Sequence, residues 1–229
     1  MKLKITIPLA GALVAGTLLV TATPGQAGLL GGLSSALNPS APPTNSAETA
    51  NLGQDLTGLN GRFASSMREM LMAQALTLLA LGDQAKGDQL TTEAKSLQGV
   101  NDINVVARSI TVSESASTEI NQKMKASTKL SRASKGDLAS AVPYYLAGSV
   151  QAAGLPNAYQ SWIARARSSA TGGGAIGMLS GGGLGNLGSV VTVTSKLPSL
   201  ISTWGTTTHN FVRFAQGNQV NTGDLASKI

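Results

Sequence analysis

The residue types that most often carry catalysis or bind metals are scarce in this sequence. His209 is the only histidine and cysteine is absent, so neither a histidine-based metal cluster nor a thiolate site can form. The eleven Asp and Glu residues are scattered, and Asp83 and Asp88 are the closest pair expected outside a helix. We expect this pair to solvate a turn, with an ion site as the alternative. The sequence therefore predicts no metal or other cofactor.

No pattern of a familiar catalytic class is present either. A Ser-His-Asp triad would need His209 as its base, and the G-x-S-x-G, S-x-x-K and H-E-x-x-H patterns are all missing. His209 is expected on a helix beside Phe211, where a partly exposed histidine is the simpler interpretation. The glycine-rich run lacks the lysine and the Ser or Thr of a phosphate-binding loop. We therefore predict a protein that is not an enzyme, with an exported hydrolase of unrecognised motif as an alternative.

A group of aromatic residues near two prolines is the candidate ligand pocket. Together with neighbouring methionines, these residues could line an apolar cavity between helices. The alternative is that they pack in the core around a kink at Pro143. The four residues are Tyr144, Tyr145, Tyr159 and Trp162.

A dense basic stretch is the candidate contact with an anionic surface. Lys125, Lys129 and Arg132 follow one another at four- and three-residue spacing, which would place them on one face near the end of a long helix. Cations there complement the negative end of the helix dipole, which is a sufficient structural explanation. The functional alternative is contact with anionic lipid or polysaccharide.

A glycine-rich segment over 172–191 lies in a stretch without charged residues. Four of its glycines recur at every fourth position, which on a helix would form a flat stripe for close helix contact, and apolar residues stand between them. This pattern is typical of a membrane-associating or self-associating segment. So many glycines also destabilise an isolated helix, so a loop is the alternative. The four residues of the stripe are Gly173, Gly177, Gly181 and Gly185.

The order of the first 27 residues is that of a secretory signal peptide. Two lysines precede an apolar run over 5–20, and small residues follow at Gly25 and Ala27. We expect cleavage after Ala27, with Ala22 as the alternative. The apolar run is shorter than the roughly 20 residues that span a bilayer, which argues against a membrane anchor. We therefore expect a periplasmic or secreted protein.

Residues 28–46 are predicted to form a flexible leader, because three prolines there oppose a helix. Without cysteine we expect neither a lipid anchor nor disulfides, so stability must come from a hydrophobic core. The formal net charge of +6 falls to about +4 when the two signal-peptide lysines are removed. This mild charge suits anionic envelope surfaces and is weak evidence for nucleic acid.

Apolar residues at three- and four-residue intervals predict a single helical domain over 47–229. Gly82 and Gly99 are expected to end its first two helices. The most regular seam, from Ile103 to Ser127, is apolar at its start and rich in serine in its middle, and its helix is expected to pack antiparallel on the first. The predicted helices cover 46–81, 84–98, 102–132, 135–153, 156–170 and 198–217. Residues 189–196 could be a short extended piece or the lead into the last helix.

Together these patterns predict an all-α protein, a helical bundle with long antiparallel helices, a flexible leader and a glycine-rich internal segment. The leading functional hypothesis is an exported, non-enzymatic protein that binds an envelope protein, lipid-like molecule or polysaccharide. The alternative is a membrane-active or self-associating protein that uses the glycine stripe over 173–189, including peripheral membrane contact. No nucleic-acid partner is expected.

Overall fold

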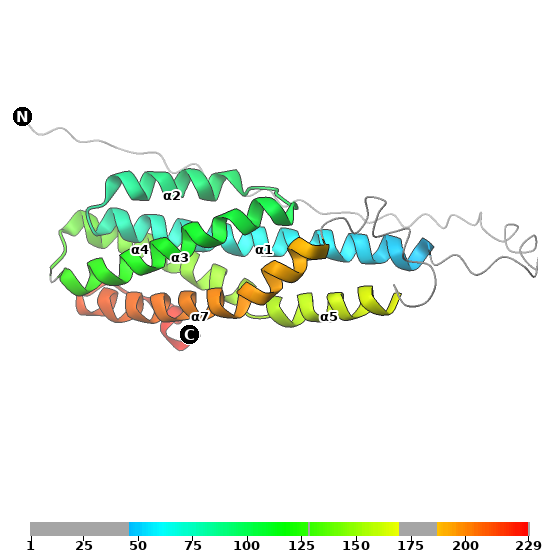
Figure 1. Ribbon diagram of the computed structural model, residues 1–229. Helices are drawn as coiled ribbons and strands as arrows, with labels where there is room; N and C mark the ends of the chain where they lie inside the picture. Colours follow the sequence, from blue (N-terminus) through cyan, green and yellow to red (C-terminus); the bar gives the residue numbers. More distant parts are fainter. Residues whose placement is uncertain (1–45, 128, 170–186, 229) are drawn as a thin grey trace, which may run out of the picture. The chain divides into compact units, whose positions relative to one another are not determined.

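The chain folds as an all-α helical bundle, as predicted. A computed structural model describes residues 46–127, 129–169 and 187–228, and no β-strand occurs within these ranges (Figure 1). The helices are α1 (Ser46–Ala80), α2 (Gln84–Ser96), α3 (Ile103–Ala126), α4 (Arg132–Ala152), α5 (Leu155–Ser169) and α7 (Leu187–Gly217), followed by the 3-10 helix η3 (Gly223–Ser227). All of them belong to one compact unit.

Several expectations fall outside the described residues and stay predictions. They are the signal peptide over 1–27, nearly all of the leader over 28–46, and the glycine stripe formed by Gly173, Gly177, Gly181 and Gly185. The last residues of the glycine-rich segment, 187–191, are described, and they form the first turn of α7.

The ends of α1 and α2 lie where their glycines predicted. Gly82 has φ +81° and Gly99 has φ +72°, a left-handed backbone that glycine adopts without steric cost. The Asp83 side chain accepts from the backbone N–H of Lys86 (3.2 Å) and so caps the start of α2. The connection between the two helices is therefore short, and α2 folds back along α1 (Figure 1).

The α3 helix runs parallel to α1, so the expectation that these two helices pack antiparallel was wrong. Asn60 Nδ2 of α1 donates to the backbone oxygen of Asn101 just before α3 (3.0 Å), and Gln74 Nε2 donates to Ser117 Oγ farther along both helices (2.8 Å). The reason is topological. Because α2 already reverses the chain, the helix after it returns to the direction of α1.

The long antiparallel partners of α1 are instead α4 and α5, together with the shorter α2. Ser66 Oγ donates to the backbone oxygen of Gly148 in α4 (2.9 Å), and Trp162 Nε1 of α5 donates to the backbone oxygen of Leu52 (2.9 Å). Residue numbers thus rise along α4 and α5 as they fall along α1. Long antiparallel helices are therefore present as predicted. The partners of α1 are α4 and α5, however, and not α3.

The third predicted helix is shorter than the expected 102–132. It ends at Ala126, and α4 begins at Arg132 with Ser131 as its cap, because the Ser131 side chain accepts from the backbone N–H of Ser134 (3.1 Å). Several serines near this point can cap a helix, and spacing alone does not distinguish them. Helix α4 then continues through Pro143 without a break.

The last helix begins at Leu187 and not near Pro198. Val190, Val193, Leu197 and Leu200 are buried at three- and four-residue steps, so burial of this face outweighs the β-preference of the valines. Residues 189–196 therefore belong to the first turns of the helix, and they are neither extended nor a lead that precedes it. Figure 1 shows that α7 changes direction along its length, which is typical of a helix with an internal proline.

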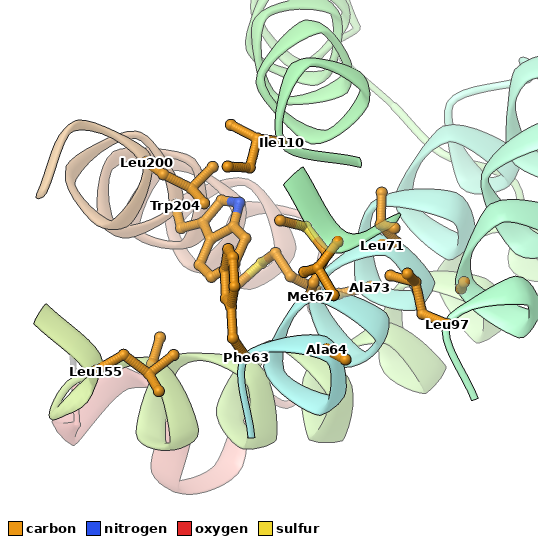
Figure 2. Close-up of a cluster of buried hydrophobic side chains, with 14 of the residues drawn as sticks. Phe63, Ala64, Met67, Leu71, Ala73, Leu97, Ile110, Leu155, Leu200 and Trp204 are labelled. Carbon is orange, nitrogen blue, oxygen red and sulfur yellow. The ribbon is translucent and has the colours of Figure 1, made fainter. Parts of the chain in front are cut away.

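The hydrophobic core lies around α1, with large side chains contributed by every neighbouring helix. Figure 2 shows Phe63 and Met67 of α1, Ile110 of α3, Leu155 of α5 and Trp204 of α7 pointing into this shared interior, and all five are at most 2% exposed. Such burial is the dominant stabilising contribution in a chain without disulfides.

A buried hydrogen-bond network crosses the core at the serine-rich part of the α3 seam. Gln74 of α1 donates to Ser117 Oγ (2.8 Å) and to the Ser113 backbone oxygen (3.1 Å), while its own side-chain oxygen accepts from Ser113 Oγ (3.1 Å). Trp204 Nε1 of α7 donates to the same Ser113 hydroxyl (2.8 Å). Since every polar atom in the network has a partner, it fixes the relative position of three helices.

Candidate ligand-binding groove

The four aromatic residues predicted to form a ligand pocket do not come together. Tyr145, Tyr159 and Trp162 are fully buried, whereas Tyr144 is half-buried. Their polar atoms contact α1 at separate points: Tyr145 near Thr77 (3.4 Å), Tyr159 at Asn60 (2.9 Å) and Trp162 at Leu52 (2.9 Å). Three of the four are therefore core residues spread along α1, which was the alternative interpretation.

Burial also keeps the phenols of the two buried tyrosines protonated at neutral pH. Burial raises the pKa of the Tyr145 and Tyr159 phenols well above the usual range. Tyr145 packs against Phe211 with ring centroids 4.5 Å apart, and Tyr159 meets Phe63 edge-on at 6.4 Å. These contacts stabilise the core and leave Tyr144 as the aromatic residue that faces a hollow.

A hollow of about 250 Å³ lies between α1, α2 and α4, and Tyr144 forms part of its wall. Its floor is formed by Arg68, Glu69 and Met72, which belong to a longer half-buried stripe along α1. Between Phe63 and Ala80 every residue of α1 is buried except for a half-buried set at three- and four-residue spacing, so this stripe is the one line along which this part of the helix reaches solvent. The set comprises Ser65, Arg68, Glu69, Met72, Leu76 and Leu79.

The walls of this hollow, which we call the α1–α4 groove, combine apolar and charged side chains. Met72 and Tyr144 supply an apolar and aromatic surface, and Lys95 and Gln98, at the end of α2 and just beyond it, supply polar groups. A second hollow of about 130 Å³ shares Arg68 and Gln98 with the first and continues toward Asn101. The groove thus passes from an apolar end to a polar end, with a guanidinium between them.

Among the described residues, one cation of the groove takes part in no ion pair. Arg68 forms an ion pair with Glu69, whose side chain is only 12% exposed. Lys95 is exposed and takes part in none of the ion pairs found among the described residues. The formal charge of the three residues is positive, so the groove favours an anionic group beside an apolar one.

The three basic residues predicted to share a helix face lie in different elements. Lys125 is in the last turn of α3, Lys129 is in the connection that follows, and Arg132 is the first residue of α4. All three are exposed. The prediction of a common face was wrong, because the helix ends at Ala126 and the spacing rule does not extend across the break.

Neighbouring Lys123 lies between two carboxylates at the end of the bundle where α2 begins. Its Nζ lies 3.0 Å from Asp83 Oδ2 and 3.9 Å from Glu119 Oε1. The hydrogen bonds from Lys123 and from the Lys86 amide lower the pKa of Asp83. Desolvation, followed by the hydrogen bond and charge of Asp83, raises the pKa of Glu119. Asp88, the expected neighbour of Asp83, accepts instead from Gln84 (3.1 Å).

These opposite pKa shifts predict opposite effects of neutralising the two carboxylates. Asp83→Asn should lower the free energy of unfolding at pH 7, and the deficit should shrink as pH falls through the lowered pKa, since that carboxylate stabilises the fold only when ionised. Glu119→Gln should raise stability at pH 7, because the raised pKa means that ionisation of Glu119 weakens the fold as pH rises. Asparagine can cap a helix as aspartate does, so Asp83→Asn keeps the cap of α2 and removes only the negative charge. Urea unfolding between pH 3 and pH 7 measures both, and parallel pH profiles for the two variants would contradict the assignment.

His209 is exposed on α7, as the simpler interpretation expected. In the described ranges no group of three or more His, Asp or Glu side chains is placed to hold a metal ion. No helix within 46–127, 129–169 or 187–228 is both long enough and apolar enough to cross a membrane.

Most of the groove could not be predicted from the sequence, although one signal was present. Arg68 and Glu69 are the only charged residues between Phe63 and Ala80. In a helix that is buried on nearly every side, two adjacent charges mark the line that stays in contact with water. The partners of that line on α2 and α4 could not be read from spacing along α1.

The chain matches no protein-family model, and no curated protein or solved structure is detectably similar to it.

Proposed function

We propose that the chain is an exported, non-enzymatic protein that binds an anionic, lipid-like molecule in the α1–α4 groove. Support for export comes from the order of charges, apolar residues and small residues over 1–27. Support for binding comes from the groove itself, where a half-buried stripe of α1 is left open between α2 and α4. That open stripe is the observation that carries the proposal.

The chemistry of the ligand follows from the two ends of the groove. Met72 and Tyr144 offer an apolar surface to a hydrocarbon chain, while Arg68 and Lys95 offer donors to a carboxylate or phosphate head. Because Arg68 already pairs with Glu69, the main attraction for the head group is the ammonium of Lys95, which forms no ion pair with any described residue. A hollow of about 250 Å³ accommodates only part of a lipid, so the rest of the chain would extend along the surface.

Calorimetric titration with lauryl phosphate tests the proposal. We expect binding, with about tenfold lower affinity for Lys95→Glu because an attraction is replaced by a repulsion, and a similar loss for Tyr144→Ala because the apolar wall is removed. Lys196→Glu is the matched control, since Lys196 is exposed on α7 and lines neither hollow. Lauryl maltoside has the hydrocarbon chain without the phosphate, and inorganic phosphate lacks the chain. Separate titrations with these two probes show whether the site needs both parts of the ligand or only one. Equal affinity of Lys95→Glu and the control would refute the proposal.

A further inference from the structure

The solvent-facing side of α4 carries an apolar patch that the groove does not use. The buried residues of α4 are Leu138, Ala141, Tyr145, Gly148 and Ala152. On the opposite side, Pro143, Leu146, Ala147 and Val150 line a shallow hollow of about 320 Å³ together with Gln151 and Lys228. Val150 is 58% exposed, and Val191 of α7 is the other large apolar side chain exposed in the described part of the chain.

Cations flank this patch at both ends. Arg132 lies on the same side of α4 as Val150, because three- and four-residue steps connect the two residues along the helix. The steps pass through positions 136, 139, 143 and 146. Lys135 stands beside that line, and Lys228 closes the hollow at the other end. None of these three cations takes part in an ion pair among the described residues.

Among the described residues, no carboxylate lines this hollow. Asp137, the only acid of α4, falls about a third of a turn from the outer line, toward the core side. Asp224 of η3 is exposed but does not line the hollow. The outer side of α4 is therefore an apolar strip with positive ends, a combination that suits a surface with both hydrocarbon and negative charge.

We propose that the outer face of α4, defined by Arg132, Lys135, Pro143, Leu146, Val150 and Lys228, docks on the surface of an anionic lipid bilayer. The helix lies parallel to the bilayer, Pro143, Leu146 and Val150 enter the boundary between head groups and acyl chains, and the cations contact lipid phosphates. Each cation near an anionic surface adds a similar increment to the attraction. An anionic polysaccharide would satisfy the cations but offers no apolar layer for Val150.

Sedimentation with vesicles of phosphatidylcholine, with and without phosphatidylglycerol, tests this proposal. The parent protein should bind the anionic vesicles more strongly, and added salt should weaken binding. Val150→Asp should lower the partition coefficient at least tenfold, and Arg132→Gln with Lys135→Gln should lower it roughly fivefold for each charge removed. All forms keep the same N-terminal residues, so that differences between them report on α4.

Matched controls separate this surface from general effects of charge and polarity. Val191→Asp repeats the apolar-to-acid change on α7, and Arg108→Gln with Arg167→Gln removes two cations from exposed positions elsewhere. Both should bind as the parent does. Circular dichroism checks folding, and Val150→Ser serves as a milder second variant at this exposed position.

The result that would overturn the proposal is equal vesicle binding by the α4 variants and their controls. The proposal would also be overturned if the parent protein ran as a dimer on gel filtration and the α4 variants lost this dimer but still bound vesicles. That result would assign the face to contact with a second copy of the chain. The vesicle experiment is independent of the α1–α4 groove. Lys95→Glu should lower the affinity for lauryl phosphate and leave vesicle binding nearly intact.

Discussion

Replacing Trp204 with alanine is expected to lower the free energy of unfolding by about 4 kcal/mol. The indole is 2% exposed and lies in the interior shared by α1, α3 and α7, so alanine leaves a large cavity. The change also removes the donor at 2.8 Å from Ser113 Oγ, in a network where no other donor replaces it. Urea unfolding monitored by circular dichroism measures the loss.

A second substitution at the same position separates packing from hydrogen bonding. Trp204→Phe keeps a buried six-membered ring and removes the pyrrole ring that carries the N–H, so its cost should be about 1–2 kcal/mol, well below that of alanine. A loss below about 1 kcal/mol for Trp204→Ala would contradict the view that this side chain joins the three helices.

Replacing Gly148 with leucine is expected to cost about 3 kcal/mol, because α4 lies too close to α1 at this point for a side chain. A Cβ atom at Gly148 would lie 3.2 Å from the backbone nitrogen of Met70 and 3.4 Å from the backbone oxygen of Ser66. Backbone atoms cannot move aside as a flexible side chain can, so the two helices must separate. The Ser66 hydroxyl, which donates to the Gly148 oxygen at 2.9 Å, would lose its partner.

The same substitution should also weaken lauryl phosphate binding, since Tyr144 is one turn from Gly148 on the helix that moves. Gly136→Leu is the matched control. It lies on the same helix with no atom within 4 Å of an added Cβ, so stability should stay equal or rise with helix propensity. Unfolding and titration of the two variants together measure the effect, and equal stability of both would show that the contact at Gly148 tolerates a side chain.

Much of the helical architecture could be predicted because its signals are local. The stripe of apolar residues from Leu52 to Leu71 predicted α1, and glycines with left-handed backbone ended α1 and α2 where expected. The seam of α3 was also predicted correctly, since Ile103, Ser113 and Met124 are all buried. Two serines of that seam also form hydrogen bonds with Gln74, which lies opposite them on α1.

The errors occurred where local signals were ambiguous or where the partner lies far away in the sequence. Several serines could cap α4, and the valines before Pro198 favour a strand in isolation. All four aromatic residues were assigned to a pocket because they stand near two prolines in the sequence, yet three of them contact α1 at different points. A helix rises about 1.5 Å per residue, so neighbours along two helices soon lie far apart in space.

The sequence by itself determined how little chemistry this protein has available: one histidine, no cysteine, scattered acids, and an N-terminal segment with the order of a signal peptide. Composition limits which sites can exist at all, whatever the fold. Only the tertiary structure decided where the remaining side chains meet. It left Arg68, Glu69 and Met72 open between α2 and α4, and it directed the cations and apolar residues of α4 to a common outer face. The physical reason is that burial depends on neighbours distant in the sequence, and spacing along one helix does not specify them.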